Sequence, residues 1–188
     1  MKYLLIITLF ICSIGYGQQQ VIKYNAYVSY WNSQTLIPDS VIWNCIPHTK
    51  VVGREAGFHS TGNRVNQERD YKHSGYDIGH NADASDLNGN KEDEYNSFDF
   101  ANAFPQLPNC NRITWLALEN YVRQLATKYG SVKVKVYWHN VAGYMGKDKV
   151  TIPLYCDKEI WYNGKHESYS MPNTDTVNKH DFTYYLVK

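Results

Sequence analysis

The chain has 188 residues, enough for one domain with a buried core and too few for two ordinary domains. Lys and Arg number 19 against 18 Asp and Glu, which gives a formal net charge of +1 at pH 7. This near-neutrality argues against a protein that coats nucleic acid with a broadly basic surface, although it leaves room for a small basic site.

Residues 1–17 have the pattern of a secretory signal peptide. Lys2 precedes an apolar run at residues 3–11, and small residues follow before Gln18. The run is shorter than the roughly 20 apolar residues of a transmembrane helix, and no other segment is a candidate span. A lipoprotein site at Cys12 is the weaker alternative, because no small residues stand just before it. We therefore expect a secreted or periplasmic chain without stable membrane association, and its oligomeric state stays open.

The next part of the chain predicts two strands and a long loop. Residues 24–31 are rich in Tyr, Val and Trp and end in a polar turn, and residues 41–43 form a second short strand. Residues 53–73 are polar and rich in Gly, Asn and Arg, which indicates a loop. Loops of this length are often functional, and this one carries Arg54, Arg64 and Arg69.

Residues 109–130 give the clearest helix signal. Gly130 is a suitable C-terminal stop, and Asn109 or Asn111 is a suitable N-cap. Glu119 and Arg123 lie one turn apart beside the apolar face. That face repeats at the 3.6-residue period of a helix and consists of Trp115, Leu118, Val122, Leu125, Ala126 and Tyr129.

Strands are expected again after this helix. Val alternates with Lys over residues 132–136, and apolar runs follow at residues 150–155 and 159–162. Residues 182–187 are a candidate for a last strand. Strands that surround one strong helix indicate a mixed α+β domain.

Three cysteines follow the predicted leader: Cys45, Cys110 and Cys156. An odd number in an oxidising compartment favours one disulfide and one buried thiol, with the pairing left open. The sequence has no CxxC motif, so a thiolate zinc site is not expected.

His80 is the best candidate for a general base. A histidine taken at random is more often structural than catalytic, but His is the usual base near neutral pH. Gly79 permits a tight backbone turn beside it, and Asp77 is placed to orient a neighbouring group.

Asn111 and Glu119 are candidates for holding a hydrated Mg²⁺. The simpler interpretation makes Asn111 a helix cap and pairs Glu119 with Arg123 across one turn. The functional one has the Asn111 amide oxygen bind the ion while Glu119 holds one of its waters, because Mg²⁺ keeps most of its hydration shell. Arg123 suits both, since a guanidinium group also matches phosphate oxygens.

Residues 83–90 superficially resemble a calcium-binding loop. Placing Gly89 at the sixth position puts Ala84 first and Tyr95 twelfth, where acidic ligands are required. We therefore expect a turn there. The sequence also lacks HExxH, P-loop and GxSxG motifs.

Two motifs with the right order and spacing resemble the DNA/RNA non-specific endonucleases of the ββα-metal group. They are GYDIGHNADASDL at residues 75–87 and NAFPQLPNCNRITWLALENYVRQLA at residues 102–126. The family pattern reads Asp-Arg-Gly-His-x-x-Pro-Ala-x-Asp, then Asn-x-x-Pro-Gln and Leu-Asn-Arg-x-x-Trp-x-x-Leu-Glu. The resemblance covers nearly all of residues 18–188 and implies an α+β fold with a central antiparallel sheet. Its ββα-metal motif would have a helix that carries the metal ligand.

The resemblance also implies roles for individual residues. His80 would be the general base and Asn111 the metal ligand. The catalytic group would also include Glu119, near the metal-bound water, and Asn102, as a supporting polar residue. Arg123 and Arg112 would contact substrate or support the site, and Asp77 and Gly79 would support it. Mg²⁺ is the implied cofactor, with Mn²⁺ as a substitute, and DNA and RNA are the implied substrates.

The chain departs from the family pattern at three positions. Ile78 replaces an arginine, Asp83 replaces a proline, and Cys110 stands where leucine is usual. The lost arginine removes a cation beside the reacting phosphate, which would cost several kcal/mol of transition-state stabilisation. Asp83 adds negative charge near a polyanion or attracts a second cation.

These observations predict an exported, Mg²⁺-dependent endonuclease that cuts DNA and RNA with little sequence preference. The rival prediction is a catalytically silent or weakened relative that binds nucleic acid or protein without turnover. Ile78 is the main support for the rival, and the presence of His80, Asn111 and Glu119 is the main argument against it.

Overall fold

The computed structural model describes residues 19–54, 57–62 and 67–188. The predicted leader at residues 1–17 and Arg64 lie outside the described residues. No described helix is long and apolar enough to cross a membrane.

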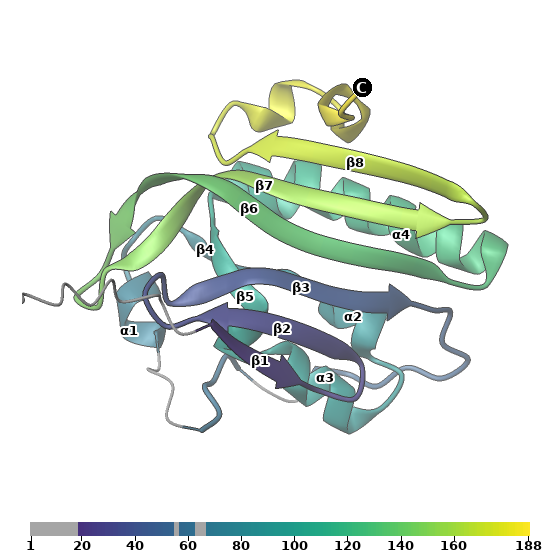
Figure 1. Cartoon of the computed structure of the whole chain (residues 1–188), viewed down its shortest axis with the longest axis horizontal. Coiled ribbons are helices and arrows are strands. Elements are labelled where there is room, and N and C mark those ends of the chain that lie inside the picture. Colours follow the sequence, from purple (N-terminus) through teal and green to yellow (C-terminus); the bar gives the residue numbers. More distant parts are fainter. Residues whose placement is uncertain (1–18, 55–56, 63–66) are drawn as a thin grey trace, which may run out of the picture.

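A six-stranded antiparallel sheet forms the body of the structure (Figure 1). Its order is β1-β2-β3-β6-β7-β8, so the central pair, β3 and β6, joins an N-terminal to a C-terminal group of strands. The strands are β1 (Gln19–Lys23), β2 (Tyr27–Asn32), β3 (Ile37–Cys45), β6 (Val132–Met145), β7 (Val150–Tyr162) and β8 (Lys165–Pro172).

A second, two-stranded sheet and the long helix form the ββα unit. Strand β4 (Asp77–His80) pairs antiparallel with β5 (Ala103–Gln106), placing Asp77 opposite Gln106 and His80 opposite Ala103. A π-helical turn, η2 (Cys110–Trp115), then leads directly into α4 (Leu116–Tyr129). The predicted α+β fold with a ββα motif is confirmed.

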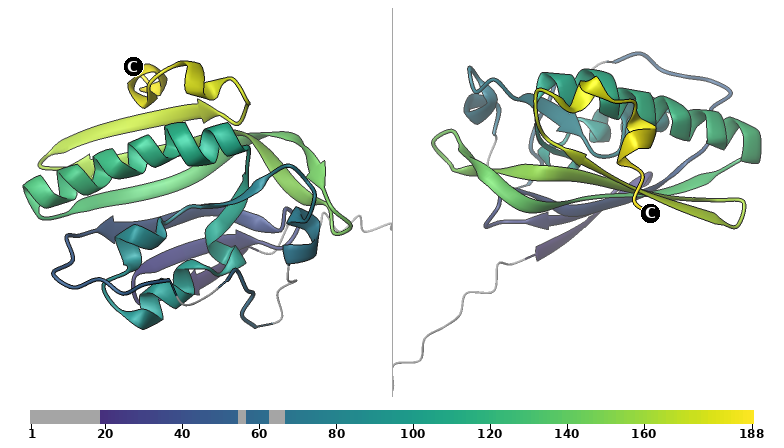
Figure 2. Two further views of the ribbon diagram at one scale, coloured as in Figure 1. Left: turned by 180° about the vertical axis from the view of Figure 1, so that it is seen from behind. Right: turned by 90° about the horizontal axis from the view of Figure 1, so that it is seen from above.

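Short elements connect these parts. They are α1 (Glu68–Tyr71), α2 (Ala84–Leu87), α3 (Lys91–Ser97) and η1 (Phe100–Asn102) before the long helix, and η3 (Val177–Lys179) and η4 (Phe182–Tyr185) at the C-terminal end. The helices lie on one face of the large sheet, with α4 across the β6–β8 half (Figure 2).

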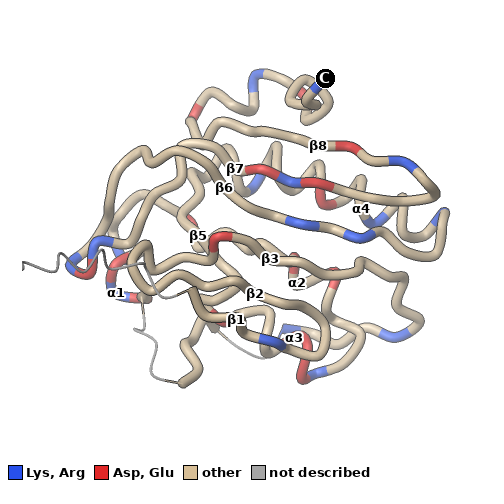
Figure 3. The backbone as a smooth tube through the Cα atoms, in the orientation of Figure 1, with Lys and Arg blue, Asp and Glu red and all other residues tan. Residues whose placement is uncertain are grey.

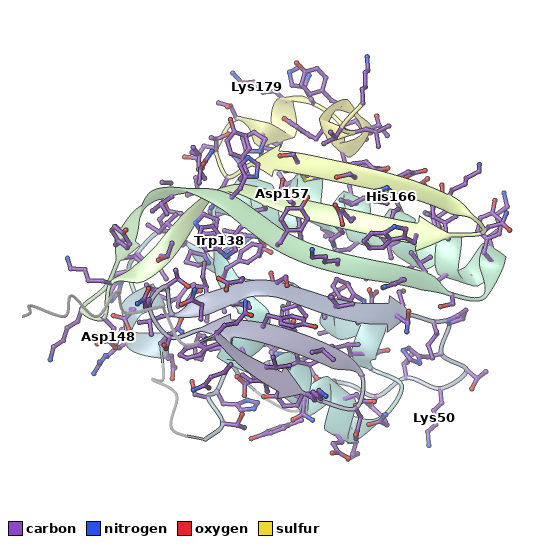
Figure 4. All side chains as sticks on the ribbon, viewed as in Figure 1. Lys50, Trp138, Asp148, Asp157, His166 and Lys179 are labelled. Carbon is purple, nitrogen blue, oxygen red and sulfur yellow. The ribbon has the colours of Figure 1, made fainter. Side chains whose placement is uncertain are left out.

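Alternation along the strands decides which side chains form the core. Val132, Val134 and Val136 are buried beneath α4, whereas Lys133 between them is exposed. The opposite face of the sheet carries polar and aromatic groups, among them Asp157 and His166, labelled in Figure 4. On this outer face the His166 ring stacks on Trp161, with ring centroids 4.8 Å apart.

Several element predictions need correction. The two runs at residues 150–155 and 159–162 are one strand, β7, because the polar residues between them keep their ladder pairing. Strand β8 was missed because its sequence, KHESYSMP, is mostly polar. The candidate strand at residues 182–187 is instead the 3₁₀ helix η4 and an isolated bridge between Leu186 and Tyr169.

The helix end predictions were half right. Gly130 ends α4 with a positive φ of 87°, and its backbone N–H donates to the Ala126 carbonyl, as expected for a C-terminal glycine. Neither asparagine caps the helix with its side chain. Asn109 donates its amide to the Asp175 carbonyl at 2.7 Å, and Asn111 lies inside the π turn.

The expectation of one disulfide is wrong. Cys45, Cys110 and Cys156 are all free and buried. Burial raises the pKa of the Cys156 thiol, and hydrogen bonding with the neighbouring Cys110 raises it further. These thiols are core side chains, and count and spacing alone did not distinguish them from half-cystines.

Gly79 serves a close approach and not the tight turn that was predicted. It lies within strand β4, whereas the positive φ of this region, 83°, belongs to Gly75. A Cβ at Gly79 would fall 1.9 Å from Oε1 and 2.6 Å from Cδ of Gln106, whose side chain is completely buried on β5. Glycine at position 79 therefore leaves room for the buried Gln106 side chain beside the strand that ends at His80.

We expect Gly79→Ala to lower the free energy of unfolding by about 1–3 kcal/mol, the usual range for overpacking a core. Urea unfolding followed by circular dichroism measures the change. The matched control is Gly143→Ala on β6, where the new Cβ would meet only Ile152 Cδ1 at 4.0 Å. Equal stability of the two variants would contradict this account of Gly79.

Candidate nuclease site

The His80 ring lies at the end of β4 between two phenylalanines. Its centroid is 4.8 Å from that of Phe58 and 4.9 Å from that of Phe98. Within the described part of the chain, the buried Nε2 atom has no hydrogen-bond partner. Burial, and to a smaller extent the charge of Arg54, lower the pKa of His80 to about 4. The imidazole is therefore neutral at pH 7 and available to accept a proton.

An open pocket lies in front of this ring. Its lining includes Arg54, His80, Glu94 and Phe98, and the Arg54 guanidinium carbon sits 4.4 Å from the centre of the Phe98 ring. The structure thus brings an arginine from the predicted loop to the candidate base. Arg69 does not reach this pocket, because it pairs with Asp148 at 2.5 Å.

Asn102 anchors the chain that follows His80. Its amide oxygen accepts from the Ala82 N–H at 2.8 Å, and its amide nitrogen donates to the carbonyls of Ala82 and Ser97, each at 2.8 Å. Its backbone carbonyl accepts from the Asn81 N–H at 2.8 Å. Because Asn102 is completely buried and its amide is fully engaged, this geometry suits positioning of His80 and not contact with substrate.

Asp77 connects β4 to the start of the helix. Its carboxylate accepts from the Asn111 amide at 3.0 Å and from Arg112 through two bonds, at 2.7 and 2.6 Å. Burial opposes ionisation, but these hydrogen bonds prevail and lower the pKa of the Asp77 carboxyl. Asp77 was predicted to support the site, and these hydrogen bonds show how it would do so: they hold the start of the helix on strand β4.

These hydrogen bonds from Asn111 and Arg112 to the Asp77 carboxylate form a clamp that orients the Asn111 side chain. Because the NH₂ group of Asn111 donates to Asp77, the amide oxygen points elsewhere, and no described residue donates a hydrogen bond to it. An amide oxygen with free lone pairs is a suitable ligand for a hard cation. Arg112, the predicted substrate contact, is exposed but is held on Asp77.

The π turn places Asn111 and Glu119 on one face of the helix. Eight residues of regular α-helix turn through roughly 800°, which would leave the two side chains about 80° apart. A π turn accommodates one extra residue, so the same eight residues complete about two full turns. The turn η2 therefore brings Glu119 into line with Asn111.

Glu119 is buried and pairs with a lysine that the sequence analysis did not single out. Lys158 Nζ lies 3.9 Å from Glu119 Oε1. Burial raises the pKa of the Glu119 carboxyl to about 7; Lys158 opposes that rise and Asp86 adds to it. The signal for Lys158 was available, because the two-residue period of β7 puts it on the same face as the buried Cys156 and Ile160.

Arg123 pairs with α2 and not with Glu119. Its guanidinium contacts the carboxylates of Asp83 and Asp86, the latter at 3.1 Å, and donates to Asn120 at 2.8 Å. The predicted pair of Glu119 with Arg123 is thus replaced by one with Lys158. Asp83 also caps α2 by accepting from the Ser85 N–H, as a turn-forming residue would. Arg123, shared with Asp86, therefore offsets part of the negative charge of Asp83.

The donor set fits a hydrated Mg²⁺ better than a fully protein-bound metal. The described residues contain no cluster of three or more His, Cys, Asp or Glu side chains that would hold a metal ion. A site with one amide oxygen and several waters requires no such cluster. Asn111 would hold the ion directly and Glu119 through water.

Comparison with known proteins identifies the family of this chain. Residues 11–188 match the family described as DNA/RNA non-specific endonuclease. A nuclease from Nostoc sp. is 37% identical over 91 residues, which are 48% of this chain and 32% of that protein. The mitochondrial nuclease of Saccharomyces cerevisiae is 30% identical over 142 residues, covering 71% of this chain and 39% of that protein. The chain therefore spans about a third of the length of these relatives.

A solved structure of a complex between EndoG and EndoGI has the same fold. It superposes with a TM-score of 0.78 at 24% identity, over 92% of this chain and 81% of that one. The match of the family to almost the whole chain, together with the ββα unit, places this protein: it belongs to the DNA/RNA non-specific endonuclease family.

Proposed function

We propose that this protein is an exported, Mg²⁺-dependent endonuclease that hydrolyses DNA and RNA with little sequence preference. The observation that carries the proposal is the clamp at Asp77. It turns the amide oxygen of Asn111 away from the hydrogen-bond donors of the described residues. Asn111 lies at the start of the helix of the ββα unit, and strand β4 of the same unit carries His80. Names of the relatives, which include nucleases, support the same reaction class.

In this mechanism His80 removes a proton from the attacking water, because its ring is neutral at pH 7. Asn102 and the chain that it anchors keep the ring at the end of β4. Mg²⁺ or Mn²⁺, when bound, would neutralise charge on a phosphate oxygen and favour departure of the 3′ oxygen. Asn111 would hold that ion directly, and Glu119 would accept a hydrogen bond from one of its waters.

Contacts to backbone phosphates explain why little sequence preference is expected. Arg54 lines the pocket beside His80 and is the arginine best placed to meet a phosphate there. Arg112 is paired with Asp77, Arg123 contacts Asp83 and Asp86, and neither arginine lines this pocket. We therefore assign substrate contact to Arg54 ahead of the two predicted arginines.

We expect His80→Ala to reduce cleavage of plasmid DNA and of RNA by at least about 100-fold, the usual scale for loss of a general base. EDTA should abolish cleavage, and Mg²⁺ or Mn²⁺ should restore it. Gel assays of both substrates measure the effect. His166→Ala on the outer face of the sheet is the matched control and should cleave normally. Cleavage by His80→Ala at the control rate would remove His80 from the mechanism.

Export is supported by the leader-like pattern at residues 1–17. Expression in a bacterial host should release a chain into the periplasm or medium that begins near Gln18. Amino-terminal sequencing of that fraction measures this, and recovery of only uncleaved, intracellular protein would contradict it.

Ile78 supports a second candidate function, a family member that binds nucleic acid without efficient turnover. The side chain is half-buried against the core and pairs with Pro105 across β4 and β5, where the family pattern has an arginine. Its neighbour Asp77 is occupied by Arg112. The hydrocarbon at position 78 therefore offers no charge to a reacting phosphate.

Ile78→Arg separates the two candidates. If only the cation is missing, the substitution should raise kcat by about 100-fold or more, in keeping with the roughly 3 kcal/mol that such a group supplies. Single-turnover cleavage of a fluorescent oligonucleotide measures this. Ile78→Lys, with a charge but no planar fork, is the control and should give a smaller gain. No turnover in wild type or Ile78→Arg with any divalent metal would favour the non-catalytic function.

A further inference from the structure

Lys158 is a buried cation inside the core of the sheet. Its side chain is 1% exposed, and Nζ lies 4.2 Å from the ring centre of Trp115 and 5.9 Å from that of Trp43. In Figure 3 the neighbouring charged positions of β7 are acidic, and these belong to Asp157 and Glu159. Those two side chains lie on the other face of the strand, so they do not explain why a charge points inward.

Stability alone is a poor explanation for a buried lysine. The desolvation of two buried charges often exceeds their attraction, and apolar replacements of similar size are frequently neutral or stabilising. A methionine would fill the space between the tryptophans without a charge to bury. The reason for a lysine at this position is therefore better sought in the location of its partner carboxylate than in the stability of the ion pair.

That partner, Glu119, is the carboxylate that the π turn aligns with Asn111. The charged and titratable groups that act on it come from three elements: Lys158 on β7, Asp86 on α2 and Cys110 on η2. Asp86 already accepts from Trp43 Nε1 at 3.0 Å and from Arg123 at 3.1 Å. Among the described ion pairs, Lys158 supplies the cation of Glu119.

We propose that Lys158 is a positioning residue that favours the charged form of Glu119 and fixes it as an acceptor for water on the metal bound at Asn111. The inference rests on the proposed nuclease function. Without the lysine, burial and Asp86 would favour the protonated acid, which donates a hydrogen bond where the metal-bound water requires an acceptor. Lys158 itself touches neither substrate nor metal.

The variants Lys158→Met and Glu119→Gln, and the two combined, test this in the full-length mature chain. Lys158→Met should lower kcat at pH 7 by about 10- to 100-fold with KM within about twofold. Loss of a nearby cation raises the pKa of a carboxyl, so the acidic limb of the pH–rate profile should move to higher pH. In the Glu119→Gln background, adding Lys158→Met should cause little further loss.

A second measurement does not depend on catalysis. Binding of Mn²⁺, followed by the loss of its free-ion electron paramagnetic resonance signal, should be about 10-fold weaker in Lys158→Met at pH 7, on the scale of coupled ligand effects. The difference should become smaller as the pH is raised from 7 to 8, because a larger fraction of Glu119 is then ionised in both proteins. A purely structural defect would weaken binding by the same factor at both pH values.

Lys135→Met is the matched control, because it also removes a lysine that lies over an aromatic ring, 5.0 Å from Tyr137, but on the outer face of the sheet. Circular dichroism establishes whether each variant is folded. If Lys158→Met does not fold, Lys158→Arg replaces it. The pH–rate profile of Lys158→Arg should stay close to that of wild type, because the positive charge is kept. A folded Lys158→Met with an unchanged acidic limb and unchanged Mn²⁺ affinity would overturn the inference.

The two proposals fail differently. Wild-type protein that binds Mn²⁺ but cuts neither DNA nor RNA would end the proposed function, while the Mn²⁺ titration would still decide the role of Lys158. Conversely, normal cleavage by wild type together with equal behaviour of Lys158→Met and Lys135→Met would end only the inference about Lys158.

Discussion

The carboxylate of Asp77 holds the start of the long helix against strand β4, and the geometry of the site depends on that attachment. It accepts hydrogen bonds from two consecutive helix residues, Asn111 and Arg112. The same strand ends three residues later at His80. A displacement of the helix would therefore move the candidate metal ligand relative to the candidate base. A carboxylate with three charge-assisted or amide bonds resists such a displacement better than apolar packing, which has no preferred direction.

The charged layer beneath α4 extends this attachment to the rest of the fold. Arg123 ties the helix to α2 through Asp83 and Asp86, and Lys158 ties Glu119 to the large sheet. Each of these charges lies close to an opposite charge, with Arg123 shared between two carboxylates, and such pairing is the condition for keeping charges in a largely buried region. The helix is thus fixed at its start by Asp77 and along its length by two further contacts, while its apolar face packs on the sheet.

Sequence periodicity was sufficient for the parts of the fold that follow a regular pattern. The face of α4, the C-terminal stop at Gly130 and the Val–Lys alternation in β6 all follow from local geometry. Strand β8 and the helix η4 did not, because tertiary pairing overrides weak local preference at a polar sheet edge. The free state of the three cysteines could not be predicted either, since cysteine spacing says nothing about which side chains meet in space.

The candidate site residues likewise divide into those that the sequence pointed to and those that it did not. Order and spacing of the motifs pointed to His80, Asn111 and Glu119 as candidates, but not to the partners of Asn111 and Glu119, because these partners lie far away in sequence. Lys158 pairs across 39 positions, and Arg123 reaches back 40 positions to Asp83. The latter pair also changes the meaning of a departure from the family pattern. Asp83 contacts Arg123, so an internal cation, shared with Asp86, offsets part of its negative charge.

The departure at Ile78 removes a positive charge, and the neighbouring arginine does not fully replace it. Arg112 brings a guanidinium to the residue next to Ile78, yet both of its bonds there go to Asp77. A cation that already compensates a carboxylate contributes little net charge to a phosphate beside it. The clamp that orients Asn111 therefore engages the guanidinium nearest to position 78. The orientation of the candidate ligand is kept in this chain without a charge at position 78, and Arg54 lines the same pocket as the candidate base.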